Sequence, residues 1–238
     1  MFPVPQALTR IITEDPVVAL TFDDGPDPIY TPRLLDILAG KGARATFFMI
    51  GERAEQHPEL VARVAAEGHA IGNHSWDHPS FPFISGKERR EQVQACARAI
   101  SPYDAKLFRP PYGTMDLDSW LDIDQMGYRA VAWKIEASDW VDRAGPAIAE
   151  AVMATIQPGA VVLLHDGLFD APDNRFFPRD ATIWAVELLL HRLSGTLRFV
   201  TIPELLESGT PYWKAWEYVK PKEELNRLMR QRGSARRY

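Results

Sequence analysis

The sequence predicts an α/β fold built around a sheet of parallel strands. Short β-rich runs alternate with helical patterns through most of the 238 residues, and parallel strands need such crossover helices. No G-x-G-x-x-G motif follows the first strand, which disfavours the dinucleotide-binding form of a doubly wound sheet. Seven strand–helix units are fewer than the eight of a complete barrel. The candidates are therefore a doubly wound sheet and a shortened or incomplete (β/α) barrel.

Each of the seven units begins with a short apolar run. The predicted strands cover 17–22, 45–50, 69–74, 106–111, 128–135, 159–165 and 197–202. The helices are expected near 31–40, 57–67, 86–100, 116–126, 146–156 and 179–193, with a last one after 202. In the first helix, Pro32 suits the first helical position and Gly40 suits the end.

Composition and charge predict one main domain over 1–208 and a helical, basic extension over 209–238. The whole chain has a net charge of −5, whereas its last 25 residues carry an excess of Lys and Arg. Nothing in this balance suggests a nucleic-acid partner. One cysteine, Cys96, excludes an internal disulfide. No signal peptide or 18-residue apolar run is evident, so we expect a cytoplasmic protein, or a secreted one if a leader has been removed.

Titratable residues gather at the carboxyl ends of five predicted strands, where the functional groups of barrels collect. They are Asp23, Asp24, His74, Arg109, Asp139, His165 and Asp166. Chance would distribute such residues over both ends of the sheet. The pattern therefore favours an active site over a set of structural ion pairs. For Asp166, a structural role as an anchor of its loop is the alternative.

The spacing of His74 and His78 indicates a metal site. In an extended strand, residues four apart lie about 13 Å from each other, too far to share one zinc ion. A single helical turn over 74–78, ended by Pro79, would bring the two imidazoles together. With Asp24 as third ligand, such a site keeps open positions for water, as catalytic zinc sites do. Asp23 and His165 then suit the roles of general base and general acid.

Five short motifs carry a family resemblance. In chain order they read "TFDDGP", "HSWDH", "RPPYG", "ASDW" and "LLHD". Together they resemble the polysaccharide deacetylases with the NodB homology domain, carbohydrate esterase family 4, over about residues 17–206. The resemblance implies a distorted (β/α) barrel with seven or eight strand–helix units. It also implies a hydrolase that releases acetate from the N-acetyl group of a GlcNAc-containing, chitin- or peptidoglycan-like polysaccharide or oligosaccharide.

Site roles follow from the resemblance, position by position. It implies that Asp24, His74 and His78 bind one divalent metal ion, Zn²⁺ foremost, with Co²⁺, Ni²⁺ and Mn²⁺ as alternatives. Asp23 would be the general base, held by Arg109 through a charge-assisted contact. His165 would be the general acid, kept protonated by Asp139. The residues that would contact substrate are Pro110, Tyr112, Trp140 and Leu164, with the backbone N–H of Tyr112 stabilising the oxyanion.

Several alternatives stay open. Glu136 stands where many family members have Asp, three residues before the Asp-Trp pair. The loops 80–85 and 167–180 carry aromatics that either stack on sugars or plug the barrel. The substrate could also be an O-acetylated xylan-like glycan, or a small or lipid-linked amide. The alternative outside the class of enzymes is a non-catalytic glycan-binding module.

Overall fold

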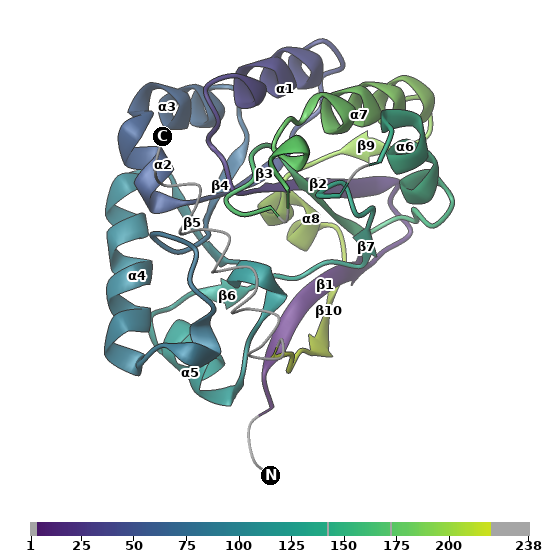
Figure 1. Cartoon of the computed structure of the whole chain (residues 1–238). Helices are drawn as coiled ribbons and strands as arrows, with labels where there is room; N and C mark the ends of the chain where they lie inside the picture. Colours follow the sequence, from purple (N-terminus) through teal and green to yellow (C-terminus); the bar gives the residue numbers. More distant parts are fainter. Residues whose placement is uncertain (1–3, 142, 172, 220–238) are drawn as a thin grey trace.

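The computed structural model describes residues 4–141, 143–171 and 173–219, and its centre is a curled parallel sheet (Figure 1). Seven strands follow the order β6-β5-β4-β3-β2-β8-β7, and β9 pairs with β2 off this path. Every described pair in this sheet is parallel. The strands are β2 (Val17–Asp23), β3 (Thr46–Met49), β4 (Ala70–Asn73), β5 (Asp104–Phe108), β6 (Arg129–Ala130), β7 (Ile135–Glu136), β8 (Val161–His165) and β9 (Arg198–Phe199). The expected distorted barrel is confirmed.

Helices surround the curled sheet, and all but α8 lie on its outer side (Figure 1). They are α1 (Tyr30–Ala39), α2 (Gly51–Gln56), α3 (Pro58–Ala66), α4 (Gly86–Ala99), α5 (Leu117–Gln125), α6 (Gly145–Met153), α7 (Asp180–Leu193) and α8 (Ile202–Glu207). Three 3₁₀ turns join them: η1 (Phe81–Phe83), η2 (Pro111–Gly113) and η3 (Asn174–Phe176). Capping boxes begin α4 and α8, where Ser85 pairs with Glu88 and Thr201 with Glu204. Helix α2 was not among the predicted helices.

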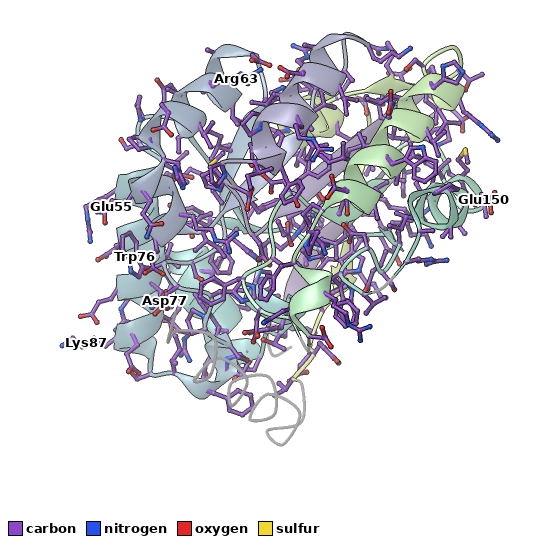
Figure 2. All side chains as sticks on the ribbon, turned by 45° about the horizontal axis from the view of Figure 1, so that its top comes forward. Glu55, Arg63, Trp76, Asp77, Lys87 and Glu150 are labelled. Carbon is purple, nitrogen blue, oxygen red and sulfur yellow. The ribbon has the colours of Figure 1, made fainter. Side chains whose placement is uncertain are left out.

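The central strand β2 is buried on both faces. Leu20 and Phe22 lie in the apolar cluster shared with the covering helices, while Val17 and Ala19 lie in a second cluster inside the curl. Helix α8 contributes Ile202 to that inner cluster. Burial on both sides explains why β2 reads as a continuous apolar run. Charged side chains such as those of Glu55, Lys87 and Glu150 lie on the outside (Figure 2).

A two-stranded antiparallel ribbon closes the region between β6 and β7. It consists of β1 (Gln6–Ile12) and β10 (Thr210–Ala215). The strand predicted over 128–135 is wrong in extent, because the chain leaves the ladder between β6 and β7. There the N–H of Ala132 donates to the carbonyl of Leu8 at 2.8 Å, and the N–H of Lys134 donates to Val161 at 2.9 Å.

The ribbon also corrects the prediction for the C-terminal extension. Its first residues are a β-strand rather than a helix, because the unpaired backbone of β1 accepts them as partners over six registered positions. Residues 220–238 of the extension lie outside the described residues, and the domain boundary at 208 stays a prediction. Within the described residues, no helix is long and apolar enough to cross a membrane.

Candidate active site

The structure places the predicted polar residues at the same edge of the curled sheet. Asp23 and His165 end the neighbouring strands β2 and β8 and are register partners. The other predicted residues follow strand ends: Asp24 follows β2, His74 follows β4, Arg109 follows β5 and Asp139 lies three residues beyond β7. All of them except His165 are almost fully buried. The sheet topology thus brings together side chains that are up to 142 positions apart.

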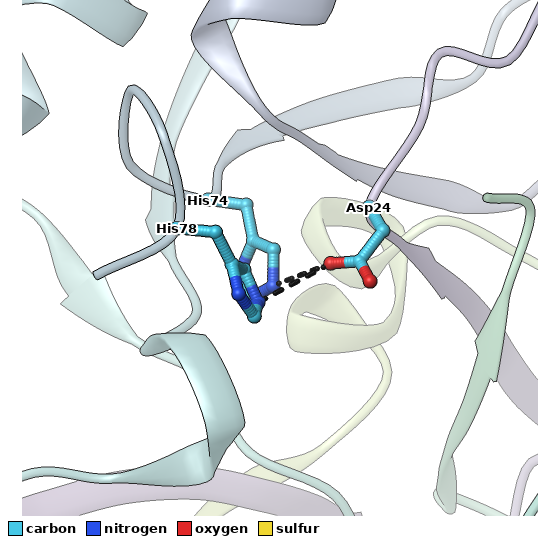
Figure 3. A group of neighbouring side chains, drawn as sticks. All are labelled: Asp24, His74 and His78. Atoms are coloured by element: carbon cyan, nitrogen blue, oxygen red, sulfur yellow. Dashed lines mark ion pairs between the residues drawn. The ribbon is translucent and has the colours of Figure 1, made fainter. Parts of the chain in front are cut away.

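Three of these residues form a compact donor set (Figure 3). Oδ1 of Asp24 lies 3.3 Å from Nε2 of His74 and 3.3 Å from Nε2 of His78. The ligand atoms of the three residues all lie within 4.8 Å of one another, and all three side chains are buried. Burial alone would raise the pKa of Asp24, but the two histidines lower it below its ordinary value. Two imidazole nitrogens and one carboxylate oxygen are donors that suit zinc.

Hydrogen bonds from outside the set orient two of these donors. The Nδ1–H of His74 donates to the carbonyl oxygen of Arg109 at 2.8 Å, which leaves Nε2 bare and directed at the site. The backbone N–H of Phe169 donates to Oδ2 of Asp24 at 2.9 Å, which leaves Oδ1 facing the histidines. The residues present therefore fit a divalent cation.

The predicted helical turn over 74–78 is wrong. Ser75 and His78 adopt left-handed backbone conformations, with φ of 66° and 62°. Side chains satisfy the backbone N–H groups instead: Asn73 accepts from Ser75 at 2.9 Å, and Ser75 accepts from His78 at 3.1 Å. Oε1 of Gln92 accepts from the backbone N–H groups of Trp76 and Asp77. This bend nevertheless places the rings of His74 and His78 4.9 Å apart, as the metal prediction required.

Arg53 was missed by the sequence reasoning. Its guanidinium donates to the carbonyl oxygens of Asp24 at 2.9 Å and Leu168 at 2.8 Å. Asp24 has a left-handed φ of 72°, and Arg53 ties this backbone to the loop that follows β8. Nothing local to α2 signals the contact, because both partners are backbone atoms distant in sequence.

Asp23 and Arg109 form a buried ion pair. Nη1 of Arg109 donates to Oδ1 of Asp23 at 2.7 Å and to Oγ1 of Thr21 at 2.7 Å. Nη2 donates to the carbonyl of Ala132 at 3.0 Å. Burial lowers the pKa of Arg109, and the Asp23 carboxylate opposes that shift. The second oxygen of Asp23 lies 3.9 Å from Nε2 of His74, so one oxygen is fixed and the other faces the donor set.

His165 and Asp139 form the second pair. The Nδ1–H of His165 donates to Oδ1 of Asp139 at 2.8 Å. Burial alone would lower the pKa of His165, but Asp139 raises it, with smaller contributions from Asp24 and Asp23, to about 9. His165 is therefore protonated at neutral pH, and its Nε2 is left to give a proton. The geometry supports an acid and a base of opposite protonation state beside one donor set.

Asp166 turns away from the donor set, in line with the anchor interpretation. Its Oδ2 accepts a hydrogen bond from Oγ1 of Thr31, and its backbone N–H donates to the carbonyl of Asp23 at 3.3 Å. The carboxylate packs directly on Gly25, where a Cβ would lie 2.2 Å from Oδ2. Burial raises the pKa of Asp166 to about 7. The residue fixes the two loops against each other.

Of the predicted substrate-contacting residues, Tyr112 has a ring contact with a residue of the donor set. Tyr112 has a left-handed φ of 58°, and its ring centroid lies 4.4 Å from that of His78. Pro110 is buried beside it, and Trp140 is partly exposed. Leu164 is fully buried in the cluster shared with the helices. The roles of these four residues in binding substrate stay predictions.

Comparison with known proteins gives consistent matches. A family model described as polysaccharide deacetylase matches residues 10–131. The chain is 39% identical over 196 residues to a chitooligosaccharide deacetylase of Sinorhizobium fredii, covering 79% of this chain and 90% of the relative. It superposes on the crystal structure of the Bc1960 peptidoglycan N-acetylglucosamine deacetylase with a TM-score of 0.76, at 30% identity, over 86% of this chain and 94% of that one.

A further solved structure has the same fold but belongs to a protein that is not described as an active enzyme. BA3943 from Bacillus anthracis, described as a CE4 family pseudoenzyme, has a TM-score of 0.76 and 25% identity, and covers 87% of this chain and 71% of that chain. The fold alone therefore does not establish turnover, which depends on the residues of the site.

Proposed function

Because the chain belongs to the polysaccharide deacetylase family, whose active enzymes are hydrolases of N-acetyl amide bonds, we propose that it is a metal-dependent N-deacetylase of GlcNAc-containing glycans. The substrate would be a chitin- or peptidoglycan-like polysaccharide or oligosaccharide. One observation carries the proposal. The donor set of Asp24, His74 and His78 lies beside an oriented carboxylate, Asp23, whose register partner on the next strand is His165, an imidazole that is hydrogen-bonded to Asp139.

The proposed chemistry assigns each group a role. A divalent cation, when bound by the donor set, supplies polarisation of the acetyl carbonyl and acidification of water. Asp23 takes a proton from the attacking water, with its carboxylate held in place by Arg109. The backbone N–H of Tyr112 donates to the oxygen that gains negative charge. His165 gives its Nε2 proton to the departing nitrogen.

The bonds and atoms of this reaction balance with water alone. A C–O bond forms between water and the acetyl carbon, and the C–N bond breaks. The products are acetate and a free amine. No redox partner or further cofactor is needed. Zn²⁺ is the preferred ion for this donor set, and Co²⁺, Ni²⁺ or Mn²⁺ are alternatives for the same geometry.

The test measures acetate released from several acetylated substrates by protein loaded with Zn²⁺. N-acetylglucosamine oligomers and peptidoglycan should give acetate, and Asp23→Asn should lower the rate by about 10²-fold or more, as expected for loss of a general base. His191→Gln, a change at an exposed histidine of α7, is the matched control. Release from acetylated xylan alone would establish the O-deacetylase alternative. Binding of glycan by metal-loaded protein without any turnover would establish the glycan-binding module.

A further inference from the structure

A carboxylate joins two tryptophans beside the site. Oε1 of Glu136 accepts the indole N–H of Trp140 at 3.1 Å, and Oε2 accepts that of Trp133 at 3.2 Å. Glu136 is exposed, and both indoles are partly exposed. This is the position at which the sequence departs from the aspartate of many family members. The longer side chain of Glu136 reaches both rings at once.

A third tryptophan extends the row. The ring centroids of Trp133 and Trp216 lie 5.2 Å apart at an interplanar angle of 68°, an edge-to-face contact. The indole N–H of Trp216 donates to the carbonyl of Gly113 at 2.9 Å. Trp216 is partly exposed and directly follows β10. The tryptophan row is thus Trp140, Trp133 and Trp216, with Glu136 between the first two.

The row borders the active site at two points. Trp140 directly follows Asp139, the partner of His165. At the other point, Trp133 packs on Gly113, where a Cβ would lie 2.7 Å from the ring. Gly113 follows Tyr112, whose ring lies against His78. A chain molecule that places one unit in the site therefore has the row next to its neighbouring units.

The chemistry of the row matches a neutral sugar chain. Indole faces bury the apolar C–H faces of sugar rings, and the indoles here are held by hydrogen bonds at their N–H groups. Each oxygen of Glu136 accepts one indole N–H and retains a further lone pair for a sugar hydroxyl or amide N–H. An exposed carboxylate also disfavours sugars that carry their own negative charge. The exposed Lys214, whose ammonium lies 5.6 Å from the Trp216 ring centroid, is a flexible group that a sugar can displace.

We propose that the tryptophan row and Glu136 bind the sugar units adjacent to the one that is deacetylated. The inference rests on the proposed function and specifies its substrate as a neutral N-acetylhexosamine oligosaccharide of several units. Trp216, which directly follows β10, extends the row by one ring and so should favour long over short oligomers.

The test compares binding of the N-acetylglucosamine hexamer and dimer by calorimetry, with all variants made in Asp23→Asn protein so that turnover does not interfere. Trp216→Ala should lower the hexamer-to-dimer affinity ratio by about 3- to 10-fold, the loss expected for one aromatic contact. Trp216→Phe should retain most of the ratio, since a ring face remains. Trp184→Ala removes an exposed tryptophan on α7 and should leave the ratio unchanged.

The outcomes separate this inference from the proposed function. An unchanged ratio in Trp216→Ala, or an equal loss for both oligomers, overturns the inference, since an equal loss indicates only a disturbed Gly113 loop. Acetate release by the wild-type protein is measured alongside. If the ratio falls as expected but no N-acetyl sugar yields acetate, the binding surface stands and the deacetylase proposal fails.

Discussion

The carboxylate of Asp139 holds His165 at two points. Oδ1 accepts the ring Nδ1–H at 2.8 Å, and Oδ2 accepts the backbone N–H of the same residue at 2.9 Å. Thr182 donates to Oδ2 as well, at 2.9 Å. One carboxylate therefore fixes the position of the ring and makes the largest contribution to the raised pKa of His165.

Asp139→Asn should move the alkaline limb of the pH–rate profile to lower pH. A general acid works only when protonated, so activity is present below the pKa of His165 and is lost as the pH rises through it. That pKa is raised to about 9, and a bound cation that neutralises Asp24 would set the limb at or below this value. Removing the Asp139 charge should lower the limb by about 1–3 pH units. Profiles of kcat/KM between pH 5 and 10 measure it, and superimposable profiles would contradict the pairing.

Arg109→Met should be strongly destabilising. The change leaves the carboxylate of Asp23 buried without its partner, which costs about 3–5 kcal/mol in the free energy of unfolding. Arg33→Met is the matched control, because the Arg33–Asp180 pair is exposed and such pairs contribute under about 1 kcal/mol. Urea denaturation of both variants measures the difference. Similar losses in the free energy of unfolding of the two variants would contradict the prediction that burial makes the Arg109–Asp23 pair more important than an exposed pair.

Zn²⁺ should stabilise the folded protein through the donor set. An ion that binds only the folded state at 100 times its dissociation constant adds about 2.7 kcal/mol. Thermal unfolding should therefore shift upward with Zn²⁺ in the wild type and much less in His78→Gln. The exposed His191→Gln serves as control and should shift like the wild type. The site assignment fails if all three proteins respond alike.

Asp166→Asn should change how stability depends on pH. Burial raises the pKa of Asp166 from 3.8 to about 7, so the folded state holds a proton that the unfolded state releases between these values. The stabilisation is fully present below about pH 4 and is lost as the pH rises toward 7. Asparagine cannot ionise. As the pH rises through this window, the free energy of unfolding of the variant should therefore come to exceed that of the wild type by up to about 4 kcal/mol.

Urea midpoints at pH 4.5 and 7.5 measure this gain. Asp15→Asn, at an exposed aspartate, is the control that should follow the wild type at both values. Parallel pH dependence of wild type and Asp166→Asn would mean that Asp166 is charged in the folded protein.

The residues of the site were predictable because their signals are local. Asp23, Arg109 and His165 each end or follow an apolar strand, and a parallel sheet brings such ends to one edge. The pairing of His74 and His78 was predicted, but its backbone was not. A helical turn is the usual way to join residues four apart, whereas here Asn73 and Ser75 side chains replace the helical hydrogen bonds.

What sequence reasoning missed depends on contacts between distant segments. The strands β1 and β10 carry weak patterns of their own and form because each supplies the partner of the other. Arg53 contacts only backbone oxygens, which leave no trace in side-chain spacing. Glu136 was recognised as a departure, but its bridge between Trp133 and Trp140 required the fold to show that both indoles lie within its reach.

The ribbon of β1 and β10 has a consequence for synthesis on the ribosome. β1 is synthesised before its registered partner β10, which lies roughly 200 positions later in the chain. At a translation rate of 5–20 residues per second, roughly 10–40 s pass between the synthesis of β1 and that of β10. During this time its apolar residues Leu8 and Ile11, buried in the finished protein, are open to pairing with other nascent chains. Expression yield should therefore respond more to chaperone supply than the stability of the finished fold would suggest.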